Sequence, residues 1–122
     1  MSGAMNGPVV VVTGGRYYQN YAHVKHVLDS ERPQMVIQGE CPTGGADALA
    51  KRWCRETGTP CIGVEANFKF YGRAGGPIRN GWMLNFFPVY KVIAFPGDRG
   101  TANCVDQAIS KEILVRDERK AP

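Results

Sequence analysis

Near its start the chain reads PVVVVTGGR over residues 8–16, a run of valines that ends in a glycine loop. Consecutive valines leave no polar face, which is typical of a strand covered on both sides, as in a parallel sheet. The two glycines that follow allow a tight turn and a close approach of the backbone to a ligand. This stretch predicts a central strand with a binding loop at its carboxyl end.

The rest of the chain alternates between helix-like and strand-like patterns. Further strands are expected at residues 34–38, 61–64 and 89–95, with a short last strand at 113–115, and helices at residues 21–30, 46–57, 77–87 and 101–113. Residues 65–76 show no periodicity, so we expect a functional loop there. The alternation predicts an α/β domain with a Rossmann-like, doubly wound parallel sheet, covered by helices on both faces.

Length and composition predict a single domain. The chain has 122 residues, of which 43% are hydrophobic and 21% charged. We expect a flexible leader or expression remnant at residues 1–7, the domain at 8–116 and a charged tail at 117–122. The sequence has neither a secretory signal nor an apolar run of about 20 residues, so a cytoplasmic location is expected.

The cysteines and histidines do not form a recognisable metal-binding pattern. Cys41, Cys54, Cys61 and Cys104 include no C-x-x-C pair, and we expect them to be buried, reduced thiols. His23 and His26 lie three residues apart on an expected helix, but the sequence shows no third ligand at a matching spacing. We therefore expect no metal and no cofactor.

Three glycine loops follow expected strands. They read TGGR at residues 13–16, TGGAD at 43–47 and PGDRGT at 96–101, and the last two lead into expected helices. In a parallel sheet such loops meet at the carboxyl edge, where helix N-termini bind anions. Asp47 is expected to cap its helix or to bind ribose hydroxyls. The loops predict a site for a phosphate-bearing ligand.

The chain resembles the SLOG superfamily, most closely its single-domain group related to YspA and YpsA. The resemblance spans residues 9–115 and rests on VTGGR (12–16), TGGADALA (43–50), GRAGGPIRN (72–80) and FPGDRGT (95–101). It implies a Rossmann-like fold and a site for a nucleotide or an ADP-ribose-like ligand. The expected ligand-binding residues are Thr13, Gly14, Gly15, Arg16, Gly44, Gly45, Asp47, Arg73, Gly76, Pro77, Arg79, Asn80, Pro96, Gly97, Gly100 and Thr101.

The last motif is also similar to a loop of two more distant families. One is the cytokinin-activating phosphoribohydrolases (the "lysine decarboxylase-like" family), in which an arginine, matched here by Arg79, and a glutamate carry N-glycosidic hydrolysis. The positions after Thr101 are Ala102, Asn103 and Cys104, so the glutamate is absent. Hydrolysis with Asp47 or Glu65 in its place stays open as an alternative.

The other distant family is DprA, which suggests DNA association. The net charge of +4 and the pI near 9.0 fit nucleic acid as well as a small anion. The arginines gather at the glycine loops and do not form a continuous stripe, so a small ligand is favoured. Phe86 and Phe87 suit a homodimer contact. We therefore expect a nucleotide-like ligand, a homodimer and no membrane partner.

Overall fold

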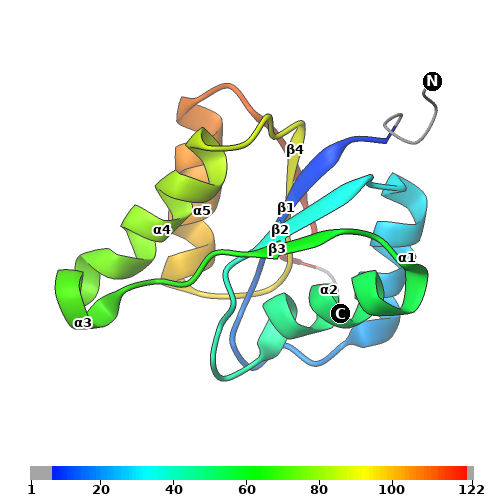
Figure 1. The fold of residues 1–122 in the computed structure, drawn as a ribbon, viewed down its shortest axis with the longest axis horizontal. Helices are drawn as coiled ribbons and strands as arrows, with labels where there is room; N and C mark the ends of the chain where they lie inside the picture. The colour runs from blue at the N-terminus through cyan, green and yellow to red at the C-terminus, as the bar shows by residue number, and fades with distance from the viewer. Residues whose placement is uncertain (1–6, 121–122) are drawn as a thin grey trace.

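The computed structural model describes residues 7–120, so the expected leader lies outside the described residues except for Gly7. One sheet contains the strands β1 (Val9–Thr13), β2 (Met35–Gln38), β3 (Cys61–Gly63), β4 (Lys91–Ala94) and β5 (Leu114–Asp117). Their order is β3-β2-β1-β4-β5, and every neighbouring pair is parallel (Figure 1). The predicted Rossmann-like α/β fold is confirmed.

The helices cover both faces of this sheet. They are α1 (Tyr21–Glu31), α2 (Gly45–Thr57), the short α3 (Phe68–Tyr71) with the 3₁₀ turn η2 (Gly72–Ala74), α4 (Gly75–Asn85) and α5 (Arg99–Ser110). In Figure 1, α1 and α2 lie on one side of the sheet and α4 and α5 on the other. No helix within residues 7–120 has the length and apolarity that a membrane crossing requires.

The valine run of β1 supplies both halves of the core. Val10 and Val12 pack with residues of α1 and α2, while Val9 and Val11 pack with Met83 of α4 and Cys104 of α5. Successive side chains of a strand point to opposite faces, so a strand buried on both faces needs apolar residues at every position. This is why the run shows no alternation.

Residues 65–76, predicted as a loop, are largely helical instead. The Asn67 side chain accepts a hydrogen bond from the backbone N–H of Phe70 (3.0 Å) and so caps α3. Gly75 is buried against Asn67 and begins α4 two residues before Pro77. The segment shows no sequence periodicity because these helical turns are too short to present one.

The order of the strands creates a switch point between β1 and β4. The chain winds from β1 to β2 and β3 on one side, and then crosses to β4 and β5 on the other. At such a point the loops after the two central strands diverge and leave a crevice at the carboxyl edge. The loops after β1 and β4 contain the first and third glycine motifs.

A network of ion pairs fixes β5 and the start of the tail. Glu31, at the end of α1, pairs with Lys91 of β4 (3.0 Å) and with Arg116 of β5 (2.9 Å). Arg116 also pairs with Glu118, which bonds to the His23 ring at 2.9 Å. The sheet therefore continues through Asp117, one residue into the expected charged tail.

Replacing Glu31 by glutamine is expected to lower the free energy of unfolding by about 1–3 kcal/mol near neutral pH, because two partly buried cations lose their counter-charge. Burial opposes ionisation of Glu31, but hydrogen bonds from Arg116 and Lys91 outweigh it and lower its pKa. A lowered pKa stabilises the fold above the unfolded-state pKa, and this contribution is lost as the pH falls through the folded-state value.

The difference between wild type and Glu31→Gln, measured by urea unfolding, should therefore shrink between about pH 6 and about pH 3. Glu112 is exposed, and Glu112→Gln should shift stability by less than about 0.5 kcal/mol at either pH. A deficit for Glu31→Gln that stays constant over this range would contradict the explanation.

Candidate functional site

The three glycine loops pack directly on one another. The Gly15 N–H donates to the Pro96 carbonyl (2.7 Å), and the Ala46 N–H donates to the Gly15 carbonyl (3.1 Å). A Cβ on Gly45 would collide with the Gly15 carbonyl, and one on Gly97 would collide with the Thr101 hydroxyl. These glycines let the loops approach one another closely. The N–H of Gly15 is engaged by the Pro96 carbonyl and so is not free to bind a ligand.

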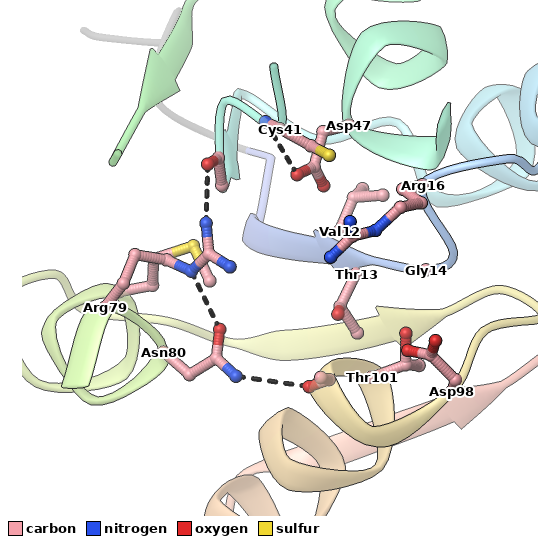
Figure 2. Close-up of a pocket in the computed structure, with 13 residues that line it drawn as sticks. Val12, Thr13, Gly14, Arg16, Cys41, Asp47, Arg79, Asn80, Asp98 and Thr101 are labelled. Carbon is pink, nitrogen blue, oxygen red and sulfur yellow. Dashed lines mark hydrogen bonds between the residues drawn. The ribbon is translucent and has the colours of Figure 1, made fainter. Parts of the chain in front are cut away.

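Where the loops meet, they border a small polar hollow of about 80 Å³ (Figure 2). Its walls come from the loop after β1, the loop between β2 and α2, the second turn of α4 and the start of α5. The lining residues are Val12, Thr13, Gly14, Arg16, Gly39, Cys41, Asp47, Arg79, Asn80, Met83, Asp98, Gly100 and Thr101. We call this the polar hollow.

One side of the polar hollow is suited to an anion. The first hydrogen bond of α5 runs from the Ala102 N–H to the Asp98 carbonyl (3.0 Å), so the N–H groups of Gly100 and Thr101 precede it. Such N–H groups at a helix N-terminus bind phosphate. Arg16 is exposed, and the structure gives its guanidinium no hydrogen-bond or ion-pair partner within residues 7–120. Figure 2 shows it extending toward the centre of the hollow.

Arg79 reaches the same space from α4. Its Nη1 donates to the Gly39 carbonyl (2.5 Å), and its Nε donates to Asn80 Oδ1 (3.0 Å). A Cβ on Gly39 would collide with this guanidinium, so only glycine leaves room for it. Sequence reasoning expects Arg79 and Asn80 at the start of a helix, but they lie in the second turn, because α4 begins at Gly75.

The side chain of Asn80 connects α4 to the start of α5. It is 2% exposed, and its Nδ2 donates to the Gly100 carbonyl (3.2 Å) and to Asn103 Oδ1 (3.1 Å). Both amide protons and the oxygen that receives Arg79 therefore have protein partners. In the structure this amide positions Arg79 against the start of α5, and its expected contact with a ribose or a base stays a prediction.

Asp47 is the buried carboxylate of the site. The expectation that Asp47 caps α2 is wrong, because the cap position is Gly44 and Asp47 is the third residue of the helix. Its Oδ2 instead accepts the Cys41 N–H (3.2 Å) of the preceding loop. Burial raises the pKa of Asp47, and the charge of Arg79 and the N–H groups of Cys41 and Gly39 limit that rise.

A second, larger hollow of about 500 Å³ adjoins the first. Arg16, Gly39, Cys41 and Arg79 line both, and the larger one is completed by Glu40, Pro42, Thr43, Glu65, Ala66 and Phe68. Phe68 is 53% exposed. Since small-molecule pockets are typically about 300–1,000 Å³, the polar hollow holds part of a ligand and the larger hollow can hold the rest.

Gln38 fixes the loop that separates the hollows. It is 1% exposed, accepts the Glu40 N–H (2.6 Å) and donates to Glu40 Oε1 (2.5 Å). Glu40 has a left-handed backbone (φ 49°), a strained state for a residue with a side chain, and such states concentrate at functional sites. Sequence reasoning did not select Gln38. It could have been found as a polar residue at the end of an otherwise apolar strand.

None of the three residues that follow Thr101 supplies the carboxylate of the hydrolase motif, and the last of them, Cys104, carries a thiol. Its side chain is fully buried, and burial raises the pKa of its thiol to about 11 despite a hydrogen bond from Thr13. Near pH 7 it is a neutral thiol and supplies no carboxylate. Within residues 7–120 no cluster of three or more His, Cys, Asp or Glu side chains could hold a metal ion.

The expected site residues fall into three groups. Those in the polar hollow are Thr13, Gly14, Arg16, Asp47, Arg79, Asn80, Gly100 and Thr101. Gly15, Pro96 and Gly97 line a separate shallow depression, which shares Arg16 and Asp98 with the polar hollow. Gly44, Gly45, Arg73, Gly76 and Pro77 line neither hollow. Sequence reasoning missed five lining residues, which come from the end of β1, two loops and the buried face of α4: Val12, Gly39, Cys41, Asp98 and Met83.

Comparison with known families identifies the fold. The model of the YspA, cpYpsA-related SLOG family matches residues 8–71, the segment that contains the first two glycine loops. The chain belongs to this SLOG family. The SLOG residues matched include Arg16 and Asp47, whereas Arg79 and the loop before α5 lie beyond the match.

A solved structure extends the comparison to the rest of the SLOG domain. DNA processing protein A (DprA) from Streptococcus pneumoniae is similar with a TM-score of 0.71 at 18% identity. The alignment covers 93% of this chain and 51% of DprA, so the SLOG chain spans about half the length of that protein. At this identity the likeness shows the fold. No curated protein matches the chain.

Proposed function

We propose that this SLOG domain binds a nucleotide or an ADP-ribose-like ligand across the two hollows. The observation that carries the proposal is the convergence of Arg16, Arg79 and the N-terminus of α5 on the polar hollow. Two guanidinium groups and backbone amides around one small space favour a phosphate group.

The carboxylates of the polar hollow favour a sugar phosphate over an inorganic anion. Asp47 and Asp98 line it together with the two arginines, so its formal charge is balanced. A carboxylate repels phosphate but accepts hydrogen bonds from ribose hydroxyls. The larger hollow then receives the base, which can stack on the exposed ring of Phe68 beside Pro42.

Binding, rather than N-glycosidic hydrolysis, is the function that the geometry supports. The hydrolase motif has a glutamate just after its Gly-Thr step, and the residues after Thr101 here are Ala102, Asn103 and the buried Cys104. Asp47 is held by the Cys41 N–H and faces the charge of Arg79. One oxygen of this carboxylate is therefore engaged by the backbone and its charge is balanced by Arg79, which favours a role in holding the ligand.

Removing Arg16 tests the proposal with little disturbance of the fold. We expect Arg16→Ala to weaken binding of AMP or ADP-ribose by about 10- to 100-fold, since a charged hydrogen bond contributes about 1.5–3 kcal/mol. Its melting temperature without ligand should stay within about 2 °C of wild type, because the side chain is exposed. Isothermal titration calorimetry with AMP, ADP-ribose, NAD and inorganic phosphate measures the first effect.

The matched control is Arg55→Ala, which removes an exposed arginine from α2, outside both hollows. It should leave the affinity unchanged. Millimolar AMP, ADP-ribose and NAD that all fail to bind wild-type protein would refute the proposal. Equal losses in Arg16→Ala and Arg55→Ala would show that binding follows net charge and not the hollow.

A further inference from the structure

Two cysteines meet where α2 turns into β3. Gly58 ends α2 in the left-handed conformation (φ 72°), and the N–H groups of Gly58 and Thr59 both bond to the Cys54 carbonyl. This tight turn brings Cys61, the first residue of β3, back against the last turn of the helix. Cys61 packs against the core cluster that contains Cys54, the two residues line one surface depression, and both thiols are free.

The two thiols differ in their access to solvent. Cys54 is 2% exposed, whereas Cys61 is half-buried. Both border a surface depression whose rim includes Lys51 and Arg55. A reagent from solvent therefore reaches Cys61 first, and the two cations attract an anionic one.

The surroundings favour the thiolate of Cys61. The neighbouring Cys54 thiol and a hydrogen bond from Gln38 Nε2 (3.8 Å) lower the pKa of Cys61 to about 7, although burial opposes the change. The hydrogen bond with Cys61 and burial raise the pKa of Cys54. The more accessible sulfur of Cys61 is thus the nucleophile, and the buried thiol of Cys54 is kept protonated beside it.

We propose that Cys54 and Cys61 form a redox-active thiol pair that closes to an intramolecular disulfide on reaction with a low-molecular-weight disulfide. The pair lies outside the polar hollow and the larger hollow, so the proposal is independent of ligand binding.

Two exchange steps close the pair. The Cys61 thiolate attacks one sulfur of the reagent, breaks its S–S bond, forms a mixed disulfide and releases the first small thiolate. Cys54 then loses its proton to solvent, and its sulfur attacks Cys61 Sγ. The Cys54–Cys61 bond forms, the mixed disulfide breaks and the second small thiolate leaves. The protein gives up two electrons and two protons, and the reagent becomes two thiols.

The sequence allows a direct test with oxidised glutathione. Arg52, Arg55 and Lys69 are trypsin sites, so digestion separates peptide 53–55, which contains Cys54, from peptide 56–69, which contains Cys61. After treatment of the folded protein, blocking of free thiols and digestion without reductant, we expect these two peptides to be joined by a disulfide. Reductant should separate them.

Variants identify the order of the steps. In a Cys41→Ser background, which removes the other half-buried thiol, the protein should lose two thiols and retain no glutathione. Adding Cys54→Ser should trap one glutathione on Cys61. Glutathione retained on Cys61 while Cys54 is present, or a Cys54 that stays free after oxidation, would overturn the proposal. The digest of the unmodified chain gives this answer even if a variant fails to fold.

Discussion

Replacing Gly45 by alanine is expected to lower the free energy of unfolding by about 3 kcal/mol or more. The backbone there is left-handed (φ 63°), which costs a residue with a side chain about 1–2 kcal/mol. The added Cβ would also collide with the Gly15 carbonyl and lie 2.6 Å from Arg16 Cα, so two loops must separate. Thermal unfolding should show a melting temperature roughly 10 °C lower.

Gly58 is the matched control for this effect. Its backbone is equally left-handed (φ 72°), but a Cβ built on it meets nothing within 4 Å. Gly58→Ala should therefore cost only the conformational term, about 1 kcal/mol. Equal losses for the two variants would mean that the close contact between the glycine loops contributes nothing to stability. A larger loss for Gly45→Ala identifies loop packing as the reason for glycine.

Replacing Arg79 by alanine should affect both ligand binding and stability. We expect binding of AMP or ADP-ribose to weaken by about 100-fold or more, because the variant loses a cation of the polar hollow and the link between Gly39 and Asn80. The free energy of unfolding should fall by about 2 kcal/mol near pH 7, since Asp47 stays buried without its counter-charge. Calorimetric titration and urea unfolding measure the two effects.

The stability loss of Arg79→Ala should also depend on pH. Burial already raises the pKa of Asp47, and the charge of Arg79 limits that rise, so the variant should raise it further. A group with a raised folded-state pKa stabilises the fold below its unfolded pKa, and this contribution is lost as the pH rises through the folded value. The deficit of the variant should therefore grow between about pH 4 and about pH 7.

Two further variants separate charge from geometry at Arg79. Arg79→Lys keeps the charge near Asp47, so it should retain most of the stability but bind ligand poorly, because an ammonium lacks the planar fork. Arg73 is exposed and lines neither hollow, and Arg73→Ala should bind like wild type. A loss in Arg73→Ala equal to that in Arg79→Ala would contradict the placement of the anion site.

The fold followed from local patterns because its central strand has a distinctive composition. A strand buried on both faces must be apolar throughout, and residues 9–12 meet that condition within one short segment. The helix at residues 45–57 could also be predicted from the sequence, since it has an apolar stripe and is followed by Gly58 at the C-cap position. The turns of α3 and η2 escaped detection because their stability comes from an Asn67 cap and from packing on α4.

The candidate site could be predicted only in part from the sequence. The glycine loops indicated the edge of the sheet at which the polar hollow lies, but their sequence could not distinguish a glycine that lines this hollow from one that packs against another loop. Gly39 matters because Arg79 arrives from a segment 40 residues away, and that approach depends on how α4 packs. Asn80 is similar, since its amide partners lie on α5.

The sequence by itself determined the alternation of strands and helices, the burial of β1 and the edge at which the loops gather, because each depends on contacts between near neighbours in the chain. Only the tertiary structure decided which glycines pack loops together, that Asn80 positions Arg79, and that the thiols of Cys54 and Cys61 meet. Those outcomes depend on distances between segments that the turns and the sheet bring together, and a pattern of residue types does not contain such distances.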